Sequence, residues 1–527
     1  PGHPEYGHTV GVEATTGPLG AGMGMAVGMA MAEAHLESVF NKENYPVVDH
    51  YTYVLGGDGC MMEGISSEAF SLAGTLGLSK LIVLYDSNRI SIEGSTDIAF
   101  RENVQERMQA FGFQTITVED GNDIDAIGKA IEAAKADTEH PSFITIKTQI
   151  GFGCPAKQGK ASAHGEPLGV ENVEALRKNL NWPSEEPFFV PEEVYKNYSE
   201  IAEQKAEVEA AWNVMFAAYC EEYPEMEALW NQYHNAKAGE ALKDDAGFWA
   251  KQEKPEASRA ISGRLINYIK DVLPNLFGGS ADLAPSNKTN MKDAGDFSKE
   301  DRAGRNLHFG VRELAMAAIG NGIMLHGGLR AYVSTFFVFS DYCKPMARLS
   351  ALMGVPLTYV FTHDSIGVGE DGPTHEPIEQ MAALRAMPNF HVFRPCDATE
   401  TEAAWYRAFT SGHTPTALVL TRQNLEPMAG SSREALKGGY IIDDCEGTPE
   451  LILIASGSEV ALAVHAKETL AAEGQKVRVV SMPCMDLFEE QSEEYKESVL
   501  PREVRRRVAV EALGSFGWDK YTGLDGK

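Results

Sequence analysis

Hydrophobic and polar residues alternate in blocks that predict strands separated by helices along most of the chain. An alternating apolar run at 51–55 is followed by a glycine turn, a helical pattern near 65–76 and an apolar run at 81–85. This order predicts a βαβ unit. A further strand near 143–147 leads into a loop rich in Gly, Lys and His at 151–169. That loop is longer than most connections and therefore indicates function.

Similar alternation returns twice further along the chain. A second α/β region is predicted by apolar strands at 329–333, 357–361 and 417–420. A third is predicted by a strand at 451–455, a helix at 459–472 and strands at 477–480 and 508–511. The stretch at 171–253 is polar with a helical period, as expected of an interdomain connector. Alternation of this kind predicts mainly parallel sheets flanked by helices, with binding sites at the carboxyl ends of strands.

The predicted fold class is therefore α/β, with three consecutive domains. We expect a first domain over 1–182, a helical connector over 183–257, a second domain over 258–430 and a third over 431–527. The chain lacks an initiator Met, opens inside an apparent motif and stops soon after a predicted strand. We therefore expect it to be part of a longer polypeptide, with its first and third domains incomplete.

Charge and cysteine content narrow the function classes. The 527 residues include 46 basic and 76 acidic side chains, a formal net charge of −30. This balance disfavours nucleic acid or an anionic membrane as a partner, and a phosphorylated substrate would need a local positive pocket. Seven cysteines without a CxxC pair indicate a reducing compartment. With no long apolar run, we expect a cytoplasmic protein.

The sharpest chemical signal is a Gly-Asp-Gly turn at a strand end. Asp58 lies between Gly57 and Gly59, and Asn88 follows thirty residues later, after the next strand. One βαβ crossover brings the Asp carboxylate and the Asn amide to one sheet edge, where their oxygens can hold Mg²⁺ or Ca²⁺ against a diphosphate. Gly59 would let the backbone and the next helix N-terminus approach a phosphate. A Gly-Asp-Gly alone is more often only a turn, and its pairing with Asn88 favours the metal site.

At this point the chain resembles the thiamine-diphosphate enzymes, and specifically transketolases. Six blocks carry the resemblance in order along nearly the whole chain: the Gly57–Asn88 unit with Ile90, Thr15–Gly20 (TTGPLG), Ser162–Gly169 (SAHGEPLG), Gly279–Asn287 (GSADLAPSN), Phe309–Glu313 (FGVRE) and His363–Pro377 (HDSIGVGEDGPTHEP). The resemblance implies a thiamine-diphosphate-binding fold whose first domain binds the diphosphate and metal, and whose second binds the pyrimidine.

The resemblance also implies a set of cofactor residues. Glu313 would hydrogen-bond the aminopyrimidine ring and promote the imino form, a task that suits a carboxylic acid kept protonated by burial. Phe336, Phe339 and Tyr342 recur at three-residue spacing, which predicts one helical face and by resemblance a stack on the pyrimidine. The remaining implied positions are Gly17, Pro18, Leu19, Asp58, Gly59, Asn88, His164 and Asp282 for the cofactor, and Asp58, Asn88 and Ile90 for Mg²⁺ (or Ca²⁺).

A second implied set faces the sugar phosphate. Imidazole titrates near neutrality and suits proton transfer at sugar hydroxyls, so His164 and His375 join Glu313 as catalytic candidates. Arginine suits bidentate contacts to phosphate. The implied substrate-binding positions are His3, Arg259, Ser286, His363, Asp371, His375 and Arg422.

The implied activity is transketolase: reversible transfer of a two-carbon ketol unit from a ketose phosphate of the xylulose 5-phosphate type to an aldose phosphate, through a thiamine-diphosphate adduct, in the pentose phosphate pathway. A homodimer with active sites at the subunit interface is implied too. Two rivals share the cofactor, a formaldehyde-accepting transketolase and a deoxyxylulose phosphate synthase. A third is a transketolase-like binding subunit without catalysis. Arg259, Ser286 and Arg422 favour a phosphorylated ketose.

Overall fold

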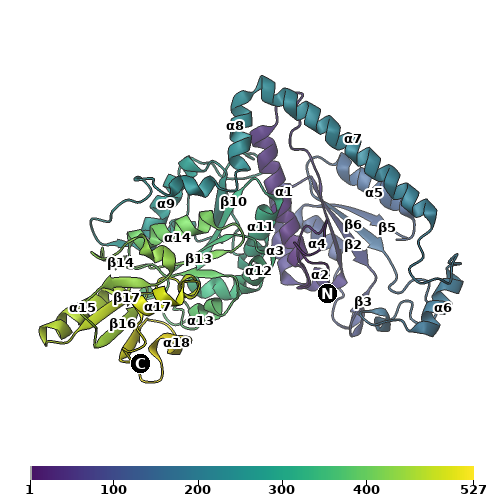
Figure 1. Cartoon of the computed structure of the whole chain (residues 1–527). Coiled ribbons are helices and arrows are strands. Elements are labelled where there is room, and N and C mark those ends of the chain that lie inside the picture. Colours follow the sequence, from purple (N-terminus) through teal and green to yellow (C-terminus); the bar gives the residue numbers. More distant parts are fainter. Residues whose placement is uncertain (1–2) are drawn as a thin grey trace. The chain divides into compact units, whose positions relative to one another are not determined.

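The structure is a computed structural model that describes residues 3–527. These residues form two compact units. One is Pro18–Asn231, and the other joins the described residues up to Gly17 with Gln232–Lys527. Figure 1 follows the elements along the chain by colour.

The unit Pro18–Asn231 is built on a four-stranded parallel sheet. Its order is β1-β2-β6-β5, from β1 (Thr52–Gly57), β2 (Leu81–Ser87), β6 (Ser142–Lys147) and β5 (Gln114–Val118). A two-stranded hairpin follows β2, from β3 (Ile90–Ser91) and β4 (Gly94–Ser95). The helices are α1 (Ala21–Phe40), α2 (Asp58–Met62), α3 (Gly64–Leu76), α4 (Val104–Phe111), α5 (Ile124–Ala136), α6 (Val170–Asn179), α7 (Glu192–Glu222) and α8 (Pro224–Tyr233), whose last two residues belong to the other unit.

Alternation along β2 and β6 explains how this sheet is covered. Ile82 and Ile144 are fully buried in a cluster with Ala130 and Ala134 of α5. The neighbouring Phe143 points to the opposite face because successive side chains of a strand alternate. Its ring lies 6.5 Å from that of Phe70 in α3. Both faces are therefore apolar, as expected of a parallel sheet between helices.

The second unit carries a six-stranded parallel sheet followed by a smaller one. The order of the larger sheet is β12-β13-β11-β10-β8-β9. Its strands are β8 (Leu276–Ser280), β9 (Asn306–His308), β10 (Arg330–Phe336), β11 (Thr358–Thr362), β12 (His391–Phe393) and β13 (Thr416–Leu420), and β7 (Glu256–Ala257) pairs antiparallel with β14 (Asn424–Leu425). The helices are α9 (Ser258–Val272), α10 (Ala284–Asn287), α11 (Glu313–His326), α12 (Ser340–Met353), α13 (Gln380–Arg385) and α14 (Ala398–Thr410).

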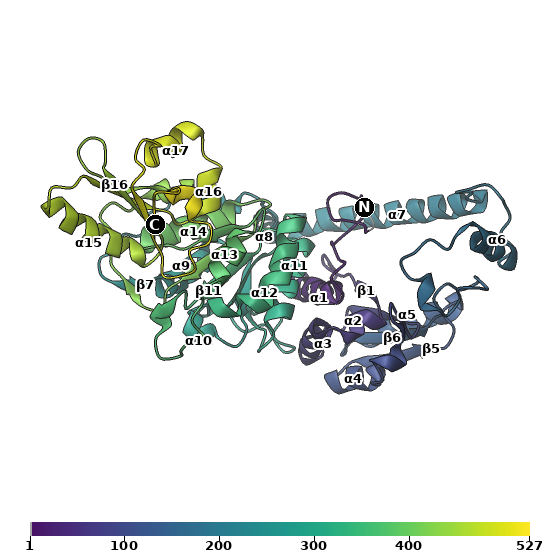
Figure 2. The same cartoon turned by 90° about the horizontal axis from the view of Figure 1, so that it is seen from below.

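Helices cover both faces of this larger sheet. Figures 1 and 2 show α9 and α14 on one face and α11 and α12 on the other. Trp405 of α14, which is fully buried, packs with Leu265 of α9 and with Val360 and Leu418 of the sheet. The apolar strands predicted at 329–333, 357–361 and 417–420 are confirmed as β10, β11 and β13.

The smaller sheet lies near the end of the chain in order β15-β17-β16-β18, with β15 antiparallel to β17. Its elements are β15 (Tyr440–Asp443), β16 (Leu451–Ala455), α15 (Glu459–Ala472), β17 (Val477–Ser481), α16 (Met485–Glu489), α17 (Glu493–Val499), β18 (Arg507–Val510) and α18 (Asp519–Thr522). The predicted fold class is confirmed: the sheets are mostly parallel and flanked by helices. Within the described part of the chain, no helix is long and apolar enough to cross a membrane.

Candidate active site

Asp58 is the first residue of α2, directly after β1 ends at Gly57. It is buried, and its Oδ1 accepts a hydrogen bond of 2.5 Å from the Tyr85 hydroxyl. Its Oδ2 accepts another, of 2.8 Å, from the Arg89 backbone N–H. Burial raises the pKa of Tyr85, and the hydrogen bond to Asp58 adds to the rise, so this hydroxyl stays a donor. The carboxylate is thus fixed in direction, and each oxygen keeps free lone pairs.

Asn88 lies at the same sheet edge. The parallel register pairs Gly57 with Asp86, which puts the ends of β1 and β2 side by side. The Asn88 Oδ1 accepts a 2.9 Å hydrogen bond from the Ile90 N–H, which orients the amide. Asp58 and Asn88 line a pocket of about 520 Å³ with other polar groups. Those other groups include Tyr85, Ser87, Arg89, Arg101, Lys147 and Thr148.

These residues fit a divalent cation only in company with a ligand. Among the described residues, no three His, Cys, Asp or Glu side chains gather as a metal cluster. One carboxylate and one amide leave most positions of a hard cation open, which suits an ion that also coordinates phosphate oxygens and water. The donor set therefore fits Mg²⁺ or Ca²⁺ held together with a diphosphate.

Gly59 of the Gly-Asp-Gly turn and Gly56 just before that turn lie close to apolar side chains. A Cβ on Gly59 would lie 2.8 Å from the Leu19 Cδ1, and a Cβ on Gly56 would lie 1.8 Å from the Met23 Cε. Gly20 has φ +79° and leads directly into α1. The turn around Leu19 thus packs on the turn around Asp58, as two segments that share one ligand would require. His164 follows a short 3₁₀ turn (Ala161–Ala163) on an exposed stretch of the long loop.

In the second unit, the structure brings predicted aromatic and histidine residues together. The Phe336 and Phe339 rings stack with centroids 6.1 Å apart, and Tyr342 lies 6.1 Å beyond Phe339. His363 lies against Phe336 at 3.7 Å, and His375 meets the edge of Phe339 at 5.5 Å. Residues far apart in sequence therefore form one continuous row of rings.

The predicted helical face for these aromatics is wrong in detail. Phe336 ends β10, Phe339 belongs to a 3₁₀ turn (Phe337–Phe339), and Tyr342 is in α12. The three rings nevertheless lie in a row, with neighbouring centroids 6.1 Å apart. Glu313 begins α11, and its carbonyl oxygen accepts a 3.5 Å contact from the Cys343 thiol of α12.

Positive charge gathers beside His363. The Arg259 Nη1 donates to the Ser286 carbonyl at 2.9 Å and lies 3.4 Å from the His363 Nε2. Burial lowers the pKa of Arg259, and the nearby Arg422 lowers it further. Arg422 donates to the exposed Glu370 carboxylate at 2.8 Å, a surface pair of the kind that contributes little free energy. An incoming anion can therefore displace Glu370 at small cost.

The same charges act on His363 itself. Burial is the main cause that lowers the pKa of this nearly inaccessible histidine, and together with the nearby Arg259, Arg422 and His375 it brings the pKa to about 4. The ring is thus neutral near pH 7 and can accept a proton or a hydrogen bond.

The other predicted positions are more loosely placed. His3, Asp282 and Asp371 are exposed, and in the described residues no hydrogen bond joins their side chains to the ring and arginine cluster. Asp282 has φ +64°, an uncommon conformation for a residue other than glycine. Sequence reasoning missed Tyr85, Thr362 and Asn287, whose side chains orient predicted residues. Asn287 stands inside the GSADLAPSN block, so the motif itself was the available signal.

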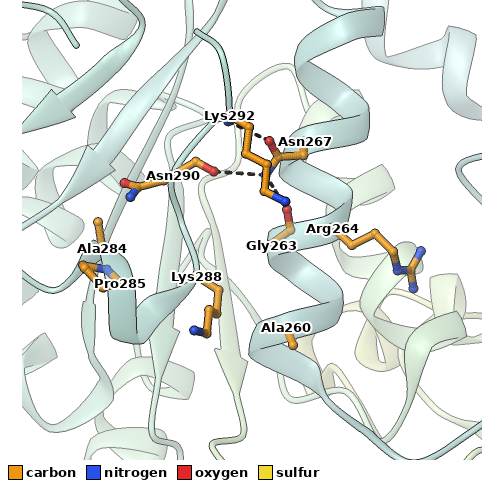
Figure 3. Close-up of a pocket in the computed structure, with 9 residues that line it drawn as sticks. All are labelled: Ala260, Gly263, Arg264, Asn267, Ala284, Pro285, Lys288, Asn290 and Lys292. Atoms are coloured by element: carbon orange, nitrogen blue, oxygen red, sulfur yellow. Dashed lines mark hydrogen bonds between the residues drawn. The ribbon is translucent and has the colours of Figure 1, made fainter. Parts of the chain in front are cut away.

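A second pocket, of about 640 Å³, lies between α9 and the segment after α10 (Figure 3). Asn267 crosses it, donating to the Asn290 carbonyl at 3.0 Å and accepting from the Lys292 N–H at 2.8 Å. Arg264 and Lys288 also line it, but Figure 3 shows them pointing in different directions. They do not converge on one anion, so this pocket is not the candidate site.

Comparison with known protein families identifies the class of protein to which this chain belongs. The chain matches a transketolase thiamine diphosphate binding domain over residues 1–238, a pyrimidine binding domain over 254–428 and a transketolase-like C-terminal domain over 438–527. It is therefore a thiamine-diphosphate-binding protein.

Relatives narrow the class to one family. The chain is 54% identical to a transketolase of Bacillus subtilis and 52% identical to one of Geobacillus stearothermophilus, in each case over all of this chain and 80% of the relative. A transketolase structure from Leishmania mexicana matches with a TM-score of 0.96 and 45% identity over 99% of this chain and 78% of that one. A transketolase structure from Campylobacter jejuni matches with a TM-score of 0.89 and 39% identity over 99% of this chain and 79% of that one. The chain belongs to the transketolase family, whose members are ketol-transferring enzymes. The predicted resemblance is confirmed, and so is thiamine diphosphate as the cofactor.

Proposed function

We propose that the protein transfers a two-carbon ketol unit from a ketose phosphate of the xylulose 5-phosphate type to an aldose phosphate, as a step of the pentose phosphate pathway. The observation that carries this proposal is the positive, ring-lined cluster in which His363, Arg259 and Arg422 lie beside Phe336 and Phe339. In a chain of net charge −30, paired arginines beside a neutral imidazole supply what a phosphorylated sugar needs.

The cofactor and metal would be held by two groups of residues, one around Asp58 and one around Phe336. Asp58, Asn88 and the Ile90 carbonyl would hold Mg²⁺ or Ca²⁺ with the diphosphate, while Gly17, Pro18, Leu19, Gly59 and His164 would line it. Asp282, Glu313, Phe336, Phe339 and Tyr342 would contact the pyrimidine side. When bound, thiamine diphosphate supplies the nucleophile and the electron sink for breaking a carbon–carbon bond beside a carbonyl.

The protein's own groups would bind, orient and move protons. Arg259, Arg422 and Ser286 would hold the sugar phosphate, and His3 and Asp371 would bind sugar hydroxyls. Neutral His363 would accept a hydrogen bond from a hydroxyl, and His164 and His375 would exchange protons with the reacting sugar. Glu313 would hydrogen-bond the aminopyrimidine ring.

We extend the proposal to assembly and location. Resemblance to the family supports a homodimer that combines the diphosphate region of one copy with the pyrimidine region of another. The family models match 1–238, 254–428 and 438–527, which supports three consecutive regions. Our proposal divides the chain into domains at 1–182, 258–430 and 431–527 with a helical connector at 183–257. None of the seven cysteines forms a disulfide within the described residues, which supports a cytoplasmic location.

The test is a coupled assay on the complete polypeptide, its mass confirmed, with thiamine diphosphate and Mg²⁺. Release of glyceraldehyde 3-phosphate from xylulose 5-phosphate and ribose 5-phosphate is expected, and Glu313→Gln should lower kcat by a factor of about 10² to 10⁴. Glu300→Gln, an exposed carboxylate outside the site, is the matched control. Turnover only with pyruvate or formaldehyde would overturn the substrate assignment, and cofactor binding without any turnover would favour a non-catalytic subunit.

A further inference from the structure

His363 is held by a buried chain of polar side chains that its role in the site does not explain. It follows β11 directly, and its Nδ1 lies 2.8 Å from the Thr362 Oγ1. The Thr362 hydroxyl lies 2.7 Å from the Asn287 Oδ1. Thr362 and Asn287 are fully buried, so each of their hydrogen bonds must be satisfied within the protein.

The direction of each hydrogen bond follows from the far end of the chain. The Ser334 hydroxyl donates to the Val360 carbonyl at 2.7 Å, so the Ser334 Oγ can only accept from Asn287. The Asn287 Nδ2 therefore faces Ser334 at 2.9 Å, and also the Ser280 Oγ at 3.2 Å. This leaves the Asn287 Oδ1 as the group that accepts from Thr362.

Thr362 has one hydroxyl proton, which it donates in the hydrogen bond to the Asn287 Oδ1. The oxygen of Thr362 can then only accept from His363, so the His363 Nδ1 carries a proton. In the neutral ring the Nε2 is then bare, and it faces the Arg259 Nη1 at 3.4 Å. If the proton were on Nε2 instead, the lone pairs of the His363 Nδ1 and the Thr362 Oγ1 would face each other. The Nε2–H would then face the N–H groups of the Arg259 guanidinium.

We propose that Thr362 and Asn287 are positioning residues that fix His363 as the tautomer protonated on Nδ1, so that its bare Nε2 accepts a hydrogen bond from a substrate hydroxyl. The catalytic meaning of this inference rests on the proposed function. The tautomer itself rests only on the hydrogen bonds within this unit.

Two further features keep the ring in place. The backbone of His363 has φ +63°, a conformation that costs free energy and persists only where the surrounding structure holds it. The next residue, Asp364, forms a buried ion pair of 2.8 Å with Arg394, and the Phe336 ring packs on the imidazole at 3.7 Å. The turn is therefore anchored independently of Thr362, and a variant at Thr362 changes the proton more than the position.

The test is solid-state NMR of the complete protein labelled with ¹⁵N-histidine at pH 7, with the His363 signals identified by their loss in His363→Gln. Wild type should show a protonated Nδ1 and a bare Nε2. Thr362→Val should shift protonation toward Nε2 and lower kcat/KM about tenfold, as for one lost hydrogen bond, and Thr362→Ser should restore both. Thr289→Val removes a buried hydroxyl that contacts Ser280 but not His363, and should leave the tautomer unchanged.

A protonated Nε2 in wild type, or an unchanged tautomer in Thr362→Val, would overturn the proposal. If Val at position 362 prevents folding, the wild-type spectrum and Thr362→Ser still decide, because the first reports the tautomer directly. The spectrum needs no substrate. If the expected tautomer is observed but the protein shows no ketol transfer, the proposed function is rejected while the positioning role of Thr362 and Asn287 still holds.

Discussion

The Asp58 pocket and the His363 cluster hold their functional groups in different ways. At Asp58, short backbone turns do the positioning: Gly59 packs on Leu19, and the Arg89 N–H orients the carboxylate. At His363, buried side chains from separate strands and helices do it, through Thr362 and Asn287. The first region depends on local geometry, and the second on tertiary assembly.

This difference has a physical cause. A metal held together with a diphosphate needs few protein ligands, so glycines and one helix start are enough. A neutral histidine between two arginines needs an enforced tautomer, and that requires buried hydrogen bonds with no competing water. Substitutions should therefore damage folding at the second region and ligand binding at the first.

The largest expected effect is a loss of stability when the buried ion pair beside His363 is removed. Arg394 is fully buried and pairs with Asp364 at 2.8 Å and with Glu459 at 2.5 Å. Arg394→Met would leave the buried Asp364 and the partly buried Glu459 without their cationic partner, and we expect a loss of about 3–5 kcal/mol in the free energy of unfolding. Urea unfolding would measure it. Arg502→Met, which breaks an exposed pair with Glu493, should cost under about 1 kcal/mol. Equal losses in both variants would break the comparison.

In the first region the next largest effect should appear in binding. Asp58→Asn keeps the shape and removes the negative charge. Its amide oxygen can still accept from the Arg89 N–H, and its NH2 can donate to the Tyr85 hydroxyl, which reverses that hydrogen bond. We expect thiamine diphosphate with Mg²⁺ to bind about 100-fold more weakly. Calorimetric titration of wild type and variant would measure this. Asp97→Asn, an exposed carboxylate paired with Arg89, is the matched control and should bind normally. Unchanged affinity in Asp58→Asn would reject the metal site, and a large loss of stability would show that Asp58 is structural.

The same contrast decides how much the sequence could predict. The helix at 459–472 and the strand at 451–455 match α15 and β16 residue for residue, because their apolar periods report burial directly. Asp58 and Asn88 were found from spacing, because one crossover brings two strand ends together. Thr362 and Asn287 were not found, since no spacing reveals that a hydroxyl and an amide 75 residues apart will meet. The helical face predicted for Phe336 is wrong because the three aromatic residues fall in a strand, a 3₁₀ turn and a helix, so their three-residue spacing does not report one helix.

A smaller effect should appear in the pH dependence of stability. Burial lowers the pKa of His363 to about 4 from an ordinary value of 6.5. Between these values the unfolded chain binds a proton that the folded chain does not, so the free energy of unfolding falls as the pH falls. From pH 6 to pH 5 the contribution is about 1 kcal/mol. Wild type should lose this amount relative to His363→Gln in parallel urea titrations. Identical pH profiles would show that His363 is not buried in its neutral form.

The smallest expected effect is on cofactor binding at the Phe339 ring. Phe339 stacks on Phe336 and meets the edge of His375, but its ring is only partly buried. Phe339→Leu keeps apolar volume and removes the ring face, so we expect a three- to fivefold higher KM for thiamine diphosphate, with little change in stability. Phe339→Tyr keeps the ring and should behave like wild type. If Phe339→Leu instead lowered stability as much as Arg394→Met, the aromatic row would be part of the core, and its exposed face would not be a surface kept for a ligand.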